Sequence, residues 1–261
     1  MKREGSAGFV RKADGERPML VKMPRTVVVI AVLMVSVGVR AQDKKLEPGF
    51  VSMFDGKTLK GWSAMPKRAS TAWSVKDGVI VGKGDKGRSY LVYRDHDVAD
   101  FELKLSYRFP GKGNSGISIR AIKDETGRRA FQAYHADLGH VGIGGQVLGA
   151  WDFHTPGRRE HACFRGDRLV IDENDHPTVT RIKDAVTVAD IRKGGWNRVR
   201  VVAKGNNFKL YINDKLSSEF TEHLDEKRRL GSGMIQLQLH DPGMVVEFKQ
   251  LRLNAGGHHD H

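Results

Sequence analysis

Polar side chains that suit sugar recognition gather in a few segments of the sequence. Gln236, Gln238 and His240 alternate with apolar residues, and residues 131–137 carry several hydrogen-bonding groups. Arg120 follows an Asn-Ser-Gly sequence that has turn chemistry. Amides and imidazoles offer planar sets of donors and acceptors, which match sugar hydroxyl groups. The pattern fits a sugar-binding sheet face, and an ordinary solvated sheet face explains it equally well.

Other short motifs indicate structure more than chemistry. Residues 82–89 nearly match a phosphate-binding loop, but Arg88 replaces the lysine and a strand-like segment follows in place of the required helix. Residues 142–145 have the wrong spacing for a dinucleotide fingerprint and predict a turn. Cys163 lies between apolar neighbours, which favours a buried structural thiol. The histidine-rich end, 258–261, is expected to be a frayed tail rather than a metal site.

The elements that must position these side chains are strands. From residue 101 to 109 the odd positions are apolar or aromatic and the even positions are polar, as in a half-buried strand. Asp77-Gly78 between two short apolar runs predicts a hairpin. A single helical turn is expected at 221–229, and long loops that frame a site are expected at 154–195. Further strands are expected at 130–137, 145–152, 197–204, 207–213, 233–240 and 244–253.

This series of strands predicts an all-β jelly-roll sandwich in one domain. If one of its sheets curves, the residues on its solvent face form a concave platform. We therefore expect function to lie on that platform and in the long loops around it.

The N-terminal segment is expected to be removed from the folded domain. Residues 27–38 form an uncharged run of 12, and small residues precede Gln42 at the −3 and −1 positions. We expect residues 1–41 to be an extension with a signal peptide, cleaved between Ala41 and Gln42. Export to the periplasm or the extracellular space, without stable membrane insertion, would follow. A buried strand or a retained anchor is the alternative, and Met23 is an alternative start.

The net positive charge of the expected folded domain is smaller than that of the whole chain. The formal charge is +13, and residues 1–41 contribute eight Lys/Arg against three Asp/Glu, which leaves +8. The remaining basic residues are interspersed with acidic ones, as on a solvated mixed surface, so we expect no nucleic-acid partner. The single cysteine excludes an intramolecular disulfide. The expected division is 1–41 and one domain at 42–261, with a core at about 50–253.

An ordered series of short motifs then carries a family resemblance. The motifs lie at 51–62 (VSMFDGKTLKGW), 73–78, 100–103, 114–116 with Arg120, 195–197, 235–240 and 246–248. The series resembles the 3-keto-disaccharide hydrolase domain family, formerly a domain of unknown function. The resemblance implies a concanavalin A-like jelly-roll sandwich of two antiparallel sheets that acts on glycosides oxidised to a ketone at C3.

The chemistry implied by the resemblance is elimination followed by hydration. A C3 ketone acidifies the C2 hydrogen, so a base can remove it and the C1 substituent can leave. The site then needs a base, a cation for the enolate oxygen and an acid for the leaving group. We assign Arg120 to the oxyanion, His135 or Asp137 to proton transfer, and His240 as a second acid–base candidate.

The expected substrate contacts are side chains on the same strands. They are Asn114, Gln132, Tyr134, Trp151, Gln236 and Gln238. Strand alternation puts Gln132 and Tyr134 opposite His135 and Asp137, so all of them can face one cleft only with a bulge. No cofactor is assigned, although His135, Asp137 and Asp152 leave room for a divalent metal.

A non-catalytic carbohydrate-binding module on the same sandwich is the alternative. It would need Trp62, Trp151 and Tyr134 as exposed stacking platforms. The family more often has Glu-x-Gln where this chain has Gln132-Ala133-Tyr134. If the missing glutamate carries the chemistry, this chain is a binding domain that has lost catalysis. A surface interaction protein without a sugar ligand is the third option. The sequence leaves the oligomeric state, the sugar and its linkage open.

Overall fold

The computed structural model describes residues 46–93, 97–139, 145–158 and 161–256. The expected signal segment, its cleavage site, residues 142–144 and the 258–261 tail lie outside the described residues. The strands are β1 Val51–Ser52, β2 Trp62–Met65, β3 Trp73–Lys76, β4 Val79–Lys83, β5 Ser89–Tyr93, β6 Phe101–Arg108, β7 Asn114–Lys123, β8 Phe131–Gly139, β9 Trp151–His154, β10 His161–Cys163, β11 Asp167–Ile171, β12 Pro177–Arg181, β13 Asn197–Lys204, β14 Asn207–Ile212, β15 Lys215–Glu222, β16 Met234–Leu239 and β17 Val245–Asn254.

Helical structure in this part of the chain is confined to short 3₁₀ segments. They span Lys67–Ala72, Gly84–Lys86 and Val188–Asp190. A search of the described residues finds no helix with the length and apolar character needed to cross a membrane.

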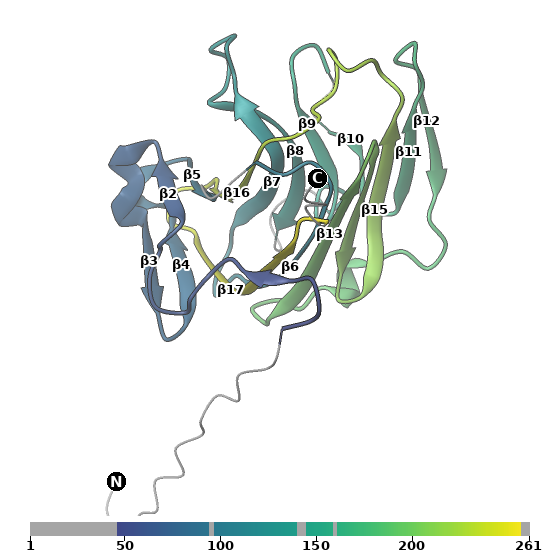
Figure 1. Cartoon of the computed structure of the whole chain (residues 1–261). Coiled ribbons are helices and arrows are strands. Elements are labelled where there is room, and N and C mark those ends of the chain that lie inside the picture. The colour runs from purple at the N-terminus through teal and green to yellow at the C-terminus, as the bar shows by residue number, and fades with distance from the viewer. Residues whose placement is uncertain (1–45, 94–96, 140–144, 159–160, 257–261) are drawn as a thin grey trace, which may run out of the picture. The chain divides into compact units, whose positions relative to one another are not determined.

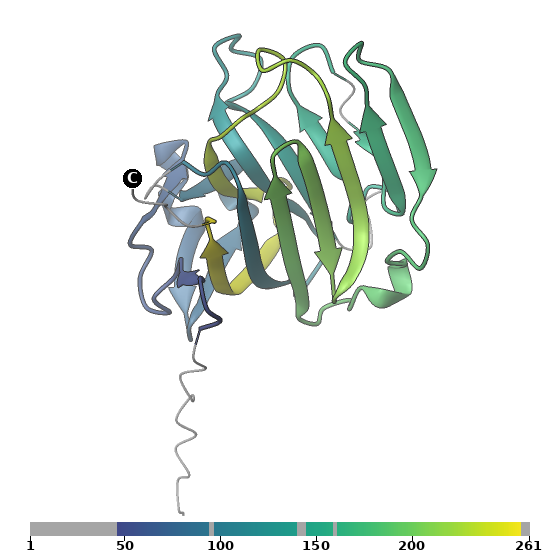
Figure 2. The ribbon, with the colours of Figure 1, turned by 45° about the vertical axis from the view of Figure 1, so that its right-hand side comes forward.

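The strands form two sheets that pack as layers of one sandwich (Figure 1). The 10-stranded sheet has the order β12-β11-β15-β14-β13-β6-β17-β4-β3, with β1 paired to β17. The 7-stranded sheet has the order β10-β9-β8-β7-β16-β5-β2. Figure 2 shows β13, β14 and β15 side by side in the larger sheet. The predicted concanavalin A-like sandwich of antiparallel sheets is confirmed, with a parallel exception between β11 and β15.

The core lies between the sheets because each contributes one apolar face. The odd positions of β6 are buried from Phe101 to Tyr107, as the alternation predicts. Aromatic rings fill the space between the layers. Phe208 and Phe220 of the larger sheet stack on each other at 4.4 Å between centroids. Tyr134 of the smaller sheet lies 4.9 Å from the Phe208 ring. This interlocked packing fixes one sheet on the other.

The Asp77-Gly78 turn is confirmed as the link between β3 and β4. Both residues have positive φ, 51° and 75°, which is the backbone of a tight hairpin turn. Glycine reaches this region without steric cost, and aspartate tolerates it better than most residues.

Several local predictions are wrong, each for an identifiable reason. Residues 221–229 do not form a helical turn, because β15 continues to Glu222, whose side chain is fully buried. Residues 145–149 form turns instead of a strand, and Gly149 has a φ of 81°. The expected loop at 154–195 contains β10, β11 and β12. Asn-Ser-Gly at 114–116 opens strand β7 and is not a turn.

Candidate active site

The outward face of the 7-stranded sheet carries a row of polar side chains. Strand register places Asp152 beside His135, His135 beside Ser118, and Ser118 beside Gln236. Their immediate neighbours in sequence lie in the core, so all four point away from the 10-stranded sheet. Residues from four strands thus meet on one surface, although they are far apart in the sequence.

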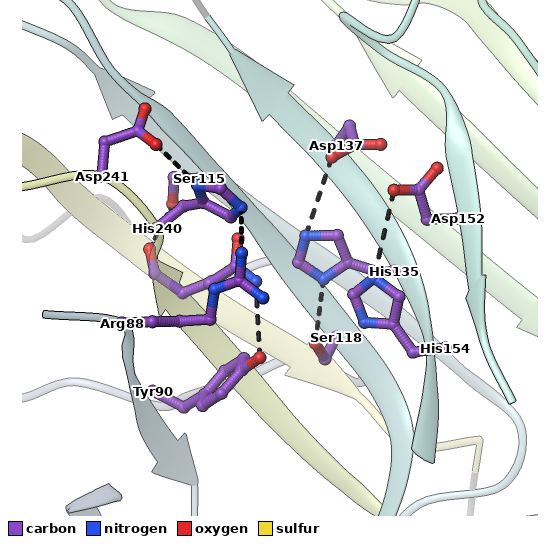
Figure 3. Close-up of polar contacts among 11 residues, drawn as sticks. Arg88, Tyr90, Ser115, Ser118, His135, Asp137, Asp152, His154, His240 and Asp241 are labelled. Atoms are coloured by element: carbon purple, nitrogen blue, oxygen red, sulfur yellow. Dashed lines mark hydrogen bonds and ion pairs between the residues drawn. The ribbon is translucent and has the colours of Figure 1, made fainter. Parts of the chain in front are cut away.

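Two imidazoles lie together at the centre of this face (Figure 3). The rings of His135 and His154 stack with centroids 4.7 Å apart and 19° between their planes. Ser118 Oγ lies 2.9 Å from His135 Nδ1. Carboxylate oxygens of Asp137 and Asp152 lie 3.8 Å and 4.0 Å from the Nε2 atoms of His135 and His154 respectively. The pair of rings is therefore bordered by two carboxylates.

His135 is held in its neutral form. Burial lowers its pKa well below the ordinary value, and nearby His154, His240, Arg88 and Arg129 lower it further. A neutral imidazole has one nitrogen that accepts a hydrogen bond and one that donates. At neutral pH this ring can accept a hydrogen bond and orient its neighbours, and it adds no positive charge of its own.

Gly116 makes room for the His135 ring. A Cβ atom built at Gly116 would overlap Nε2 and Cε1 of His135 and lie 2.7 Å from the Ala136 carbonyl oxygen. Real Cβ atoms do not approach other atoms this closely. The glycine of the 114–116 motif is thus explained by close packing, not by turn geometry.

A second cluster lies on the neighbouring strands and centres on His240 (Figure 3). Its Nδ1 atom lies 2.6 Å from Asp241 Oδ1, and the Arg88 guanidinium contacts its Nε2 atom. Because arginine is only a donor, Nε2 accepts and Nδ1–H donates to Asp241. Gln238 Nε2 lies 3.5 Å from the Tyr90 hydroxyl oxygen. The arrangement links Arg88 to Asp241 through the imidazole of His240.

A cleft of about 570 Å³ opens beside these clusters. Residues of two loops, 124–130 and 155–158, form part of its wall. His154, Tyr90 and Arg88 line it from the sheet side. This volume lies within the range of small-molecule sites, and it can take a disaccharide-sized ligand.

Arg120 is not on this face, which corrects its predicted oxyanion role. The residue has a φ of 46° and lies in a β-bulge between Ile119 and Ile122. An extra residue in a strand reverses the face of the side chains around it. Its guanidinium lies over the Phe208 ring at 4.7 Å and donates to backbone oxygens of Ala99 and Leu230.

Tyr134 and Trp151 are also not on the polar face. Both are 0% exposed and pack in the aromatic core. The Tyr134 hydroxyl contacts the Glu222 carboxylate and accepts from the Leu230 amide at 2.8 Å. They are part of the structural core and cannot stack on a sugar from the cleft, because strand alternation turns them inward.

The predicted amide residues differ in their surroundings. Gln236 and Gln238 share the polar face with His135, and among the described residues the buried Gln236 amide has no hydrogen-bond partner. Gln132 donates to Asp124 Oδ1 at 3.2 Å, beside the cleft wall. Asn114 begins β7 on the same side as Gly116 and is half-buried.

Sequence reasoning missed His154 as a site residue and dismissed Arg88 with the phosphate-loop motif. The sequence Trp151-Asp-Phe-His154 holds the missing signal, because it alternates aromatic and polar residues over one strand. The sequence pattern predicts a strand that ends at residue 152, whereas β9 runs to His154. Arg88 gave no comparable signal, because its position depends on the pairing of β5 with β16.

No group of three His, Cys, Asp or Glu side chains in the described ranges is arranged to hold a metal ion. The metal option with His135, Asp137 and Asp152 therefore gains no support from the geometry. The site has acid–base and cationic groups of its own.

Comparisons with known proteins point to one family. The model of the 3-keto-alpha-glucoside-1,2-lyase-like domain matches residues 49–254. A 3-keto-disaccharide hydrolase of Bacteroides thetaiotaomicron is 34% identical over 96 residues, which cover 32% of this chain and 33% of that protein. The match thus spans about a third of that relative's length.

Two crystal structures from Parabacteroides distasonis, provisionally described as glycosyl hydrolases, have the same fold. One has a TM-score of 0.54 at 18% identity and covers 80% of this chain and 95% of that one. The other has a TM-score of 0.52 at 17% identity and covers 79% and 99%. At such identities the likeness concerns the fold alone.

Proposed function

The chain belongs to the 3-keto-alpha-glucoside-1,2-lyase-like domain family, and from this premise we propose that it cleaves glycosides whose sugar carries a ketone at C3. The Bacteroides relative is named a 3-keto-disaccharide hydrolase, which supports the same substrate class. The observation that carries the proposal is the cleft, because an imidazole and several guanidinium groups line it together.

The proposed reaction is an elimination followed by addition of water. A base takes the hydrogen from C2, and the electron pair of that bond forms the enolate with the C3 ketone. The C1–O bond then breaks, a double bond forms between C1 and C2, and the leaving oxygen takes a proton. Addition of water places hydroxyl on C1 and hydrogen on C2, so the net result is hydrolysis.

His154 is the proposed base, because its imidazole lines the cleft. His135 stacks beneath it as a neutral ring, and the carboxylates of Asp137 and Asp152 border the pair. These neighbours can orient His154 and stabilise its positive charge after it takes the C2 proton. His135 and Asp137, which the sequence predicted to transfer the proton, are instead proposed to support His154. His240, predicted as a second acid–base group, is proposed to orient Arg88.

Arg88 is the proposed cation for the enolate oxygen, in place of Arg120. It lines the cleft and is oriented by His240, which is in turn held by Asp241. A guanidinium fixed in advance stabilises developing negative charge without reorganisation during the reaction. A cation placed this way lowers the barrier to removal of the C2 proton.

The aromatic rings that a carbohydrate-binding module would need as stacking platforms are buried. Its stacking platforms were Trp62, Trp151 and Tyr134, which are 8%, 0% and 0% exposed. A sugar cannot stack on rings that lie inside the sandwich. The cleft lining includes four arginines, His154 and Asp124, and Tyr90 is the one Phe, Tyr or Trp side chain among its described residues.

The test is turnover of a 3-keto-disaccharide beside its unmodified parent. We expect free monosaccharide from the keto form alone, and deuterium at C2 when the reaction is run in D₂O. His154→Gln should abolish both signals, and Arg88→Gln should slow them by about a hundredfold or more. Arg198→Gln, an exposed arginine on the 10-stranded sheet, is the matched control.

Retained C2 exchange in the His154 variant would overturn its assignment as base. Absence of any cleavage of the keto form by the unaltered protein, with binding intact, would overturn the enzymatic proposal.

A further inference from the structure

The lining of the cleft has an unbalanced charge. Four arginines line it, namely Arg88, Arg128, Arg129 and Arg158. The lining residues that the structure describes include a single carboxylate, Asp124. A neutral disaccharide does not require so many cations. Whether the cleft favours an anionic ligand depends on which of these charged side chains already have partners within the protein.

Asp124 serves the loop that carries it. Its carboxylate accepts from the Thr126 hydroxyl at 2.8 Å and from the backbone amides of Thr126 and Arg129 at 3.0 Å and 2.9 Å. The Gln132 amide donates to it as well, at 3.2 Å. These bonds, led by the Thr126 hydroxyl, lower the pKa of Asp124 to about 2. Its acceptor capacity is used inside the 124–130 loop, which presents Arg128.

Arg158 is neutralised by a partner behind the cleft wall. Its Nη1 atom lies 2.7 Å from Glu222 Oε2, and the Glu222 side chain is fully buried. A buried ion pair of this kind satisfies both charges and leaves little for a ligand. Arg158 therefore shapes the wall more than it attracts anions.

Two arginines have no carboxylate of their own in the described ranges. The guanidinium of Arg88 contacts the imidazole of His240, and only through that ring does it reach Asp241. Arg128 is exposed, and no side-chain partner of its guanidinium is found among the described residues. Carboxylate oxygens of the buried residues Asp137 and Asp152 lie near the imidazoles of His135 and His154. The cleft is thus positive at its rim.

We propose that the preferred ligand is a glycoside with an anionic substituent, which binds at the rim against Arg128 with Arg88 nearby. This inference rests on the proposed function and narrows its substrate class. Guanidinium groups form paired hydrogen bonds with carboxylate, phosphate or sulfate oxygens. A uronic acid residue is one source of such a group, and a phosphate or sulfate ester is the other. The neutral ring that carries the ketone would then lie over the imidazoles.

The first experiment measures binding without turnover. Calorimetry compares a disaccharide that contains a uronic acid with the same disaccharide as its neutral amide, both without a keto group. We expect the acid to bind about tenfold more tightly in dilute buffer and to lose that advantage as salt is raised toward about 1 M. Phosphorylated and sulfated disaccharides, measured in parallel, distinguish the source of the anion.

Arg128→Gln should remove the tenfold preference and leave binding of the neutral amide unchanged. Arg198→Gln makes the same change in net charge on the other sheet and should leave the preference intact. Equal affinity for every anionic ligand and its neutral analogue would overturn the inference. A preference that survives in the Arg128 variant would overturn the assignment of that residue.

The second experiment uses the 3-keto forms of the preferred acidic disaccharide and its neutral amide. A higher kcat/KM for the acid supports the inference, and equal values contradict it. If neither keto form is cleaved while the binding preference remains, the proposed function fails and the anionic specificity stands. The two failures are therefore distinguishable.

Discussion

At the scale of single residues, Gly116 decides where His135 can lie. The ring occupies the space that any side chain at position 116 would need. This contact crosses from β7 to β8, so it fixes the imidazole relative to both strands. A residue with no side chain thus positions one of the groups proposed to support catalysis.

Gly116→Ala should displace the His135 ring and destabilise the fold by about 1–3 kcal/mol, because the overpacked methyl group cannot be absorbed by a closely packed sheet. Urea unfolding measures the loss, and the His135 ring resonances should shift. Gly111→Ala is the control, since nothing lies within 4 Å of its Cβ position. Equal effects of the two substitutions would contradict the packing argument.

The neutral state of His135 predicts a dependence of stability on pH. Its pKa in the folded state lies below the value of about 6.5 in the unfolded chain, so on acidification the unfolded state binds the proton first. Stability should fall as pH drops below about 6.5 and continue to fall until the folded-state pKa is reached. His135→Gln should reduce this slope of Tm between pH 7 and 5.

The control for that slope is His176→Gln, whose histidine side chain is 77% exposed. A slope unchanged by His135→Gln would show that the acid sensitivity has another origin.

At the scale of elements, a buried ion pair ties the 155–158 loop to the larger sheet. Arg158, the last residue of this loop, lies over the Phe153 ring at 4.3 Å and pairs with Glu222 of β15. The same carboxylate contacts the Tyr134 hydroxyl. One wall of the cleft is therefore anchored through the core and not only through its own turn.

Glu222→Gln should destabilise the fold by roughly 3 kcal/mol, because it leaves Arg158 without its charged partner at a buried site. The loosened wall should raise KM for the keto substrate more than it lowers kcat. Steady-state kinetics and urea unfolding measure the two effects. Asp214→Asn breaks an exposed pair with Arg198 and should cost less than about 1 kcal/mol. An unchanged KM in the Glu222 variant would contradict the anchoring role.

Strand alternation predicted many of these elements but not their local exceptions. Strand β13 matches its predicted range, 197–204, because it has a regular pattern without glycine. The bulge at Arg120 depends on one extra residue, which no pattern of polarity reveals. The extra residue turns Arg120 away from the polar face, so the predicted oxyanion role of Arg120 is wrong. His154 was missed because its strand ends directly at a loop.

At the scale of the whole molecule, aromatic packing between the sheets sets the stability of the sandwich. Phe220 stacks on Phe208 and lies 4.8 Å from the Phe153 ring and 5.3 Å from the Trp151 ring. It thereby links both layers. The sandwich could be predicted from the apolar face of each strand, whereas sheet order depends on distant pairings that a single sequence does not reveal.

Phe220→Ala should destabilise the protein by about 3–5 kcal/mol, because it removes a large buried ring and leaves a cavity between the sheets. Val179→Ala, on a strand whose residues are all exposed, should cost less than about 1 kcal/mol. Chemical denaturation of both variants checks the difference. A small effect of Phe220→Ala would indicate that the layers close around the gap.

The row of polar residues across the 7-stranded sheet also has a consequence for synthesis. Ser118 and Gln236 are neighbours in the sheet although 118 positions separate them in the chain. The ribosome makes β7 and β8, which carry Ser118 and His135, well before it makes β16, which completes the face. Pairing at such sequence separation is slow relative to local contacts. The nascent chain should therefore lack the complete polar face until β16 has been added.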